Sequence, residues 1–208
     1  MSLLLFADDI VSVAESERML QKMLDVVYRK YRFRFNKDKS NVMVFGKRSN
    51  KDRKKNYLGE SELRIVDFYK YLGLVLDKNF SWKEHLEKIL DRARKRLKAL
   101  CGHGLREGIS ARALLRGWQV LVRPVVEYGA EIWGEKKWEE GEKLQLEMGR
   151  RVLGVSGMTT REVIQGELGL EKMSSRRKIL RLRFWYKLIN LEKSRLVYQV
   201  YKQEEKNL

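Results

Sequence analysis

The sequence predicts an α+β fold, in which a mixed part of strands and one helix precedes a part that is helical almost to its end. Short apolar runs that suit strands gather before residue 79, whereas beyond residue 80 apolar residues recur at helical spacing. A hydrophobic content of 43% over 208 residues is sufficient for a buried core. We therefore expect two domains, at residues 1–79 and 80–208.

The first predicted element is a β-hairpin at residues 3–13. Two short apolar runs flank Ala7, Asp8 and Asp9, and the pair is too short for two helices. A tight hairpin lifts both carboxylates out of the core, and Mg²⁺, which prefers hard oxygen ligands, would compensate the repulsion between them. Because Asp-Asp is also an ordinary turn pair, the hairpin alone leaves a catalytic and a structural interpretation open.

A helix is expected behind the hairpin, with Ser16 as its N-cap. Its apolar residues recur at helical spacing and should pack against the sheet of the hairpin. They are Met19, Leu20, Met23, Leu24, Val27, Tyr28 and Tyr31.

A strand, a turn and a second strand are predicted next. Residues 32–35 alternate in polarity, residues 36–40 are polar, and residues 42–45 form an apolar run. Lys39 lies where the second strand begins, so we expect it close to the sheet edge that carries the hairpin.

A basic loop at residues 47–56 separates this pair from another. Strands are expected at residues 63–66 and 69–76, joined by a short bend at Asp67 and Phe68.

Ser81 and Glu84 have the spacing of a capping box, which predicts a helix from Lys83 to about Leu100 that ends at Gly102 and Gly104. Its apolar residues share one face, and a basic helix with an apolar back can dock on a core while it offers cations to phosphates. The cations in question are Lys88, Arg92, Arg94, Lys95, Arg96 and Lys98.

Further helices should follow. Ser110 can cap the next helix, which Pro124, the only proline, is expected to interrupt or kink. A helix is then predicted at residues 139–153, and another begins at a Thr159 cap with Glu162 at the capping-box distance.

A last helix is predicted at residues 174–190, where six basic residues alternate with apolar ones. We expect its aromatic residues, Phe184 and Trp185, to belong to the core rather than to stack on bases.

The composition points to a polyanionic partner. The 45 Lys and Arg residues against 28 Asp and Glu residues give a net charge of +17, which favours nucleic acid before membrane, although a generically basic surface would look the same. One cysteine excludes an internal disulfide framework and, with two histidines, leaves a zinc site without its usual ligands. The sequence has neither a membrane-spanning run nor a basic leader, so we expect an intracellular protein, in nucleus and cytoplasm if expressed.

Four segments carry a resemblance by their order and spacing. They are Phe6-Ala7-Asp8-Asp9, Asn36-Lys37-Asp38-Lys39-Ser40, Tyr69-Lys70-Tyr71-Leu72-Gly73, and Val122 to Gly129 with Trp133 behind it. Together they resemble the reverse transcriptases of non-LTR retrotransposons (LINE-type, jockey- or CR1-like), over nearly the whole chain. The resemblance implies the end of a polymerase palm at residues 1–79 and a thumb with the region after it at 80–208.

The resemblance also implies an RNA-directed DNA polymerase that acts on an RNA template and a DNA primer. Asp8 and Asp9 would be its catalytic metal ligands, holding two Mg²⁺ ions that activate the primer hydroxyl and neutralise the leaving oxygen. Lys39 would stand near the leaving pyrophosphate as a candidate general acid. Tyr71, Leu72 and Gly73 would help to seat the primer end, and the basic helices would grip the RNA–DNA duplex.

In this family another catalytic aspartate and the nucleotide-binding box lie upstream of the Asp-Asp hairpin, and neither Asp25 nor Asp38 can replace that aspartate. Tyr31-Arg32-Phe33 also stands where the family usually has a glycine. We therefore expect the chain to be inactive as a polymerase on its own. The alternatives are a nucleic-acid-binding module without catalysis and a decayed element copy without function.

Overall fold

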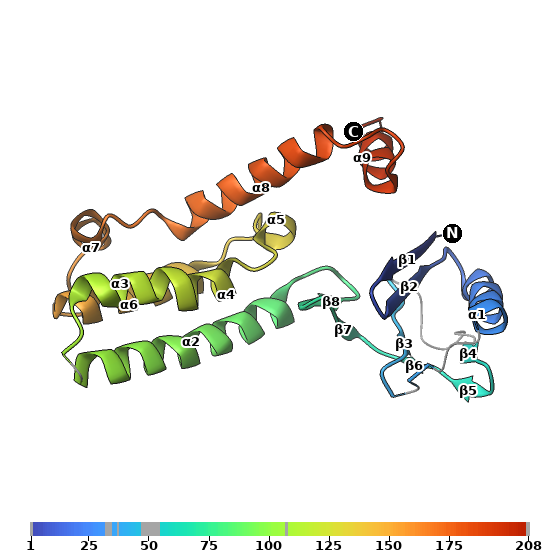
Figure 1. The fold of residues 1–208 in the computed structure, drawn as a ribbon, viewed down its shortest axis with the longest axis horizontal. Helices are drawn as coiled ribbons and strands as arrows, with labels where there is room; N and C mark the ends of the chain where they lie inside the picture. Colours follow the sequence, from blue (N-terminus) through green and yellow to red (C-terminus); the bar gives the residue numbers. More distant parts are fainter. Residues whose placement is uncertain (1, 32–34, 37, 47–54, 107, 207–208) are drawn as a thin grey trace. The chain divides into compact units, whose positions relative to one another are not determined.

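The computed structural model describes residues 2–31, 35–36, 38–46, 55–106 and 108–206. The chain divides into two compact units, Met1–Glu84 and His85–Leu208. In the described residues, all strands belong to the first unit, and the second is helical (Figure 1). The chain is thus a mixture of helices and small sheets, compatible with the α+β class.

The first unit opens with the predicted hairpin. Strands β1 (Ser2–Phe6) and β2 (Asp9–Val13) pair antiparallel, and Phe6 faces Asp9 across the last rung. Ala7 adopts a positive φ of 52° in the turn between them. The hairpin prediction is confirmed, and its tip contains Ala7 and Asp8, with Asp9 as the first residue of β2.

Helix α1 (Glu17–Tyr31) begins at the expected cap, since the Ser16 hydroxyl accepts a hydrogen bond from the Met19 amide at 3.3 Å. Met23 and Val27 are buried, as the apolar stripe predicted. The helix packs on β2 and also on β4 (Tyr57–Leu58), a strand that the sequence did not predict. Tyr28 is largely exposed, so its assignment to the core was wrong.

A small core joins the middle of this unit. Val42, Leu58 and Leu63 are buried together, and Leu20 and Leu24 of α1 pack against them. Val42 and Leu58 belong to short strands, and Leu63 lies between two others: β3 (Asn41–Val42) runs parallel to β6 (Arg64–Ile65), and β4 pairs antiparallel with β5 (Ser61–Glu62). The strand predicted at 42–45 is therefore shorter than expected, and residues 32–34 of the other predicted strand lie outside the described residues.

The predicted strand at 69–76 is wrong, because the chain reverses within it. Strands β7 (Phe68–Tyr71) and β8 (Leu74–Asp77) form an antiparallel hairpin. Leu72 and Gly73 make its two-residue turn with φ of 46° and 83°. Two consecutive positive φ values match the twist of flanking strands, and glycine adopts such a φ without strain.

Asp77 organises the chain between β8 and the following helix. Its carboxylate accepts hydrogen bonds from the Asn79 amide (2.9 Å), the Ser81 hydroxyl (2.9 Å) and the Trp82 amide (3.0 Å). Partial burial raises the pKa of Asp77, but these hydrogen bonds outweigh it and hold the pKa below its usual value. The carboxylate thereby fixes the loop that leads into α2.

Helix α2 (Lys83–Arg106) starts at the predicted residue but ends later than expected. Gly102 and Gly104 do not stop it. Glycine in a helix costs only about 1 kcal/mol relative to alanine, and Cys101 is still buried on the packed face at this end of the helix. Burial therefore outweighs the weak local propensity.

The predicted interruption at Pro124 is present as a π-helical segment. Ser110 caps α3 (Ala111–Gly117) by accepting the Ala113 amide at 3.3 Å. The π segment η2 (Trp118–Val122) follows, and α4 (Arg123–Glu127) carries the proline in its first turn. A proline is tolerated there because the first amides of a helix have no partner within it.

The remaining helices complete the second unit. They are α5 (Ala130–Trp133), α6 (Glu139–Leu153), α7 (Arg161–Leu168), α8 (Met173–Ile189) and α9 (Leu196–Lys206). Thr160, not Thr159, is the N-cap residue of α7. None of the helices described is long and apolar enough to cross a membrane.

All the helices from α2 to α8 contribute buried residues to the core of this unit. Its least exposed apolar side chains, at 0 to 1% exposure, are Ile89, Ala93, Leu97, Cys101, Trp118, Val122, Val126, Ala130, Trp133, Met148, Ile164 and Met173. The second half of α8 does not take part: Phe184 and Trp185, expected in the core, are exposed. The buried residues of α8, Met173 and Arg177, belong to its first half.

Candidate functional site

The two adjacent carboxylates lie at an exposed hairpin tip. Asp8 occupies the turn and Asp9 begins β2, and both residues are exposed. The chain reverses at Ala7, which has a positive φ of 52°, and Asp9 pairs across the hairpin with the exposed Phe6. Two hard oxygen donors on a rigid turn suit a divalent cation.

Two carboxylates alone would be an incomplete set of metal ligands. Among the described residues, no group of three or more His, Cys, Asp or Glu side chains is placed to hold a metal ion. Mg²⁺ commonly binds through one or two carboxylates together with water and substrate phosphates, so Asp8 and Asp9 fit such a site as two of its ligands.

Lys39 lies in a turn whose backbone is fixed by Asn36. The Asn36 side-chain oxygen accepts hydrogen bonds from the amides of Asp38 (3.0 Å) and Lys39 (3.2 Å). The Tyr69 hydroxyl donates to the Lys39 carbonyl at 2.8 Å, which links this turn to β7. The Lys39 side chain is exposed, but β3 behind it pairs with β6, so the expected strand pairing beside the hairpin is not formed in the described residues.

The predicted primer-seating segment is the tip of the second hairpin. Tyr71 ends β7, and Leu72 and Gly73 form the turn that follows. Leu72 is exposed, whereas Tyr71 is half-buried. A tight turn with an exposed apolar side chain can contact a ligand, but it offers no charge of its own.

The six predicted cations of α2 are all exposed. The partners of Arg96, Lys95 and Arg92 lie within the helical unit. Arg96 donates to the Leu121 carbonyl at 2.9 Å, Lys95 forms an ion pair with Asp91 at 2.8 Å, and the Arg92 guanidinium donates to the Lys88 carbonyl at 3.3 Å. Arg96 therefore joins α2 to the π segment η2 and has a packing role that sequence reasoning missed.

Arg94 and Lys98 are the cations of this face best suited to an external anion. No hydrogen bond or ion pair is described for either side chain, and they are one helical turn apart on α2. A pair of free cations at this spacing can contact successive phosphates of one strand.

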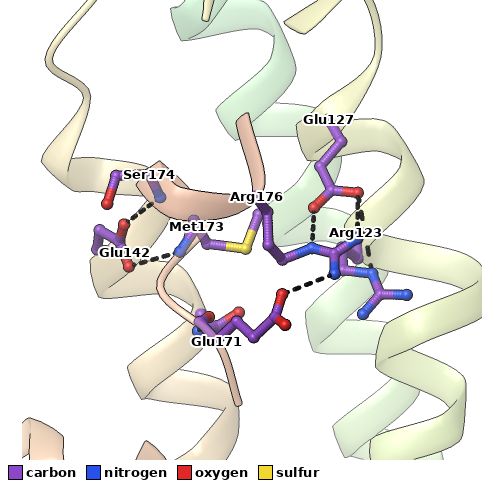
Figure 2. Close-up of polar contacts among 8 residues, drawn as sticks. Arg123, Glu127, Glu142, Glu171, Met173, Ser174 and Arg176 are labelled. Atoms are coloured by element: carbon purple, nitrogen blue, oxygen red, sulfur yellow. Dashed lines mark hydrogen bonds and ion pairs between the residues drawn. The ribbon is translucent and has the colours of Figure 1, made fainter. Parts of the chain in front are cut away.

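A polar network holds α8 to α4 (Figure 2). The Arg176 guanidinium binds both oxygens of Glu127, with Nη2 at 3.2 Å from Oε2, and reaches Glu171 at 3.3 Å. Arg123 lies 3.9 Å from the same Glu127 carboxylate. The hydrogen bond to Glu127 raises the pKa of Arg176 above its usual value, whereas burial and the nearby Arg176 lower that of Arg123.

Glu142 of α6 binds the start of α8. Its carboxylate accepts hydrogen bonds from the amides of Met173 (3.1 Å) and Ser174 (2.7 Å), as Figure 2 shows. The first amides of a helix need such acceptors, and a carboxylate also complements the helix dipole. Glu142 and Gln145 are both buried and lie three residues apart on α6, but nothing in the sequence paired Glu142 with α8.

Arg177 is buried against two indole rings, which contact each other edge to face at 5.4 Å between centroids. Its guanidinium carbon lies 5.9 Å from the centroids of both Trp133 and Trp138, and the residue is 3% exposed. Burial lowers the pKa of Arg177, and the neighbouring carboxylates of Glu142 and Glu127 oppose this. Arg176 and Arg177 thus make their contacts within the helical unit.

Comparison with protein-family models, with curated proteins and with solved structures gave no match.

Proposed function

We propose that this chain is a part of a non-LTR retrotransposon reverse transcriptase, comprising the end of the palm and the thumb. The observation that carries the proposal is the β1–β2 hairpin, which presents adjacent Asp8 and Asp9 at an exposed tip. The order of the four sequence motifs supports the same family.

In the complete enzyme, Asp8 and Asp9 would hold Mg²⁺, which supplies the charge needed at the primer hydroxyl and at the leaving pyrophosphate. The described residues contribute only these two ligands to such a site. We therefore expect no nucleotidyl transfer by this chain alone. Primer extension that appears with the purified chain and disappears in Asp8→Asn would contradict this part of the proposal.

The metal affinity of the tip can be measured with Mn²⁺ as a paramagnetic probe in place of Mg²⁺. We expect Mn²⁺ to broaden the amide resonances of residues 7–10 selectively, and the Asp8→Asn, Asp9→Asn double variant to abolish the broadening. Asp25→Asn, an exposed carboxylate of α1 that hydrogen-bonds to Gln21, is the control. Broadening that survives the double variant would refute the assignment of these ligands.

The helical unit would bind the RNA–DNA duplex through Arg94 and Lys98 of α2. In the Arg94→Gln, Lys98→Gln double variant we expect the affinity for a labelled RNA–DNA hybrid to fall about tenfold. The slope of log K against log salt should shrink by about two, because two phosphate contacts are lost. Arg112→Gln with Lys143→Gln removes the same charge from exposed positions of α3 and α6 and should behave as wild type.

A non-catalytic nucleic-acid-binding module is the second candidate, and the exposed cations of α2 favour it equally. The two candidates differ at the hairpin. If the chain only binds nucleic acid, Asp8 and Asp9 bind no metal and their substitution leaves every measured property unchanged.

A further inference from the structure

The second half of α8 presents a surface that the rest of the unit does not cover. Leu182 is 62% exposed and Tyr186 is 65% exposed, although both are large and apolar or aromatic. In Figure 1 this half of α8 leads away from α5 toward α9. Because residues three and four apart share a helix face, Leu182, Arg183 and Tyr186 lie together.

This surface is strongly basic. Helix α8 contains no Asp or Glu, and Lys178, Arg183 and Lys187 are exposed. No ion pair is described for these three cations, whereas Arg181 pairs with Glu135 at 3.3 Å. An apolar and aromatic face surrounded by unpaired cations is complementary to a polyanion that also carries flat apolar groups.

Tyr186 and Trp185 have different roles. The Trp185 indole donates to the Tyr201 hydroxyl at 3.1 Å, which joins α8 to α9 and fixes that ring. No hydrogen bond is described for the Tyr186 side chain, and its exposure is the highest among the aromatic residues of α8. Tyr186 is therefore the ring that an external base can reach.

We propose that Leu182, Arg183, Tyr186 and Lys187 form a binding site for single-stranded nucleic acid. An unpaired base stacks on Tyr186, and Arg183 and Lys187 contact the flanking phosphates. A ring that projects from a helix can stack on an unpaired base, but not on one that is already stacked within a duplex. The inference shares with the proposed function only the nucleic-acid partner, since it assigns another surface and another form of the ligand.

The test measures fluorescence anisotropy of a labelled oligouridylate and of a labelled RNA–DNA hybrid with the same full chain. Tyr186→Leu keeps the apolar bulk and removes the ring, so its affinity for oligouridylate should fall by about 5- to 50-fold. Tyr186→Phe keeps the ring and should stay within about twofold of wild type. Neither variant should change the affinity for the hybrid.

Arg183→Gln should weaken oligouridylate binding and reduce its salt slope by about one, while Arg112→Gln on α3 should change neither. Wild-type affinity of Tyr186→Leu for oligouridylate would overturn the inference. Self-association of the chain that Tyr186→Leu abolishes, with oligouridylate binding intact, would also overturn it, because the face would then bind a second copy.

The two proposals can fail separately. If the α2 double variant keeps full affinity for the hybrid while Tyr186→Leu loses oligouridylate, the duplex surface of the proposed function is wrong and the site on α8 stands. If the α2 double variant loses affinity for the hybrid while Tyr186→Leu keeps its affinity for oligouridylate, the site on α8 is wrong and the duplex surface stands. Unchanged helical circular dichroism in each variant shows that a loss of binding is not a loss of folding.

Discussion

The two units of this chain differ in how completely they bury their own residues. In the helical unit, side chains such as Trp118, Val126 and Met148 are fully buried. In the first unit, even the best-covered apolar residues, such as Val75 and Val27, keep a few per cent exposure, and Leu5 and Phe6 are largely exposed.

The difference follows from how each kind of element satisfies its backbone. A helix makes its hydrogen bonds internally and needs partners only for its apolar face. A strand needs a neighbour on each side, and every sheet of the first unit has two strands among the described residues. The helical unit can therefore bury a complete core even though α8 also exposes apolar side chains, while the sheets of the first unit keep open edges among the described residues.

Truncation of the central tryptophan should produce the largest effect. Trp118→Ala removes a fully buried ring, and we expect the helical unit to lose about 3 to 5 kcal/mol of unfolding free energy. Val42→Ala in the small core of the first unit should cost about 1 kcal/mol. Hydrogen exchange measured by mass spectrometry separates the two units, and equal losses would refute the proposed difference between their cores.

Removal of the Glu127 carboxylate should produce the second-largest loss of stability. Glu127→Ala leaves Arg176 and Arg123 partly buried without their shared partner, which should cost about 3 kcal/mol. Glu147→Ala is the matched control, because it breaks an exposed ion pair with Arg151 and should cost at most about 0.5 kcal/mol. Similar denaturation midpoints for the two variants would show that the network in Figure 2 contributes little.

Acid should destabilise the helical unit through His85. Burial, assisted by Arg92, lowers the pKa of His85 from 6.5 to about 4. The unfolded chain then binds a proton that the folded chain excludes, so stability is full above pH 6.5 and is lost as the pH falls toward 4. We expect a loss of about 2 kcal/mol between pH 6.5 and 4.5.

The contribution of His85 is obtained from the difference between wild type and His85→Gln, because other groups titrate in the same range. Urea unfolding at both pH values measures it. Parallel pH profiles for the two proteins would mean that His85 is not the group responsible.

The smallest effect is expected at the turn of the second hairpin. Gly73→Ala places a side chain at φ 83° and should weaken the β7–β8 hairpin by about 1 kcal/mol.

Gly166→Ala should have the opposite sign. This glycine lies within α7 with open space around its Cα, so alanine should stabilise that helix by about 0.5 to 1 kcal/mol. Amide hydrogen exchange should become faster in β7 and β8 of Gly73→Ala and slower in α7 of Gly166→Ala. Unchanged exchange in β7 and β8 of Gly73→Ala would refute the turn geometry.

Much of the fold could be predicted because local rules decide it. The first hairpin, the Ser16 cap and the start of α2 follow from short apolar runs and capping residues. The predictions failed where a distant contact decided the outcome: α2 passes through Gly102, and the adjacent Cys101 is buried in the core of the helical unit. The prediction of one strand at 69–76 failed for a local reason, since the turn at Leu72 and Gly73 interrupts a sequence that is mostly apolar.

The candidate site was predictable to a similar degree. The exposure of Asp8, Asp9 and the α2 cations follows from the hairpin and from the helical period. The partner of Arg96 could not be predicted, because the Leu121 carbonyl belongs to a π segment far along the chain. The aromatic residues of α8 were placed in the core because periodicity shows which residues share a face, but not which face is covered.

The sequence by itself determined where charge and apolar residues alternate, and hence the exposed carboxylates of the first hairpin and the basic character of α2 and α8. Only the tertiary structure decided which cations have partners within the unit: Arg176 binds Glu127, Arg177 lies against Trp133 and Trp138, and Arg94 and Arg183 remain exposed. The physical reason is that a guanidinium is either an internal partner or an external ligand according to which carboxylates and rings reach it, and those come from distant helices.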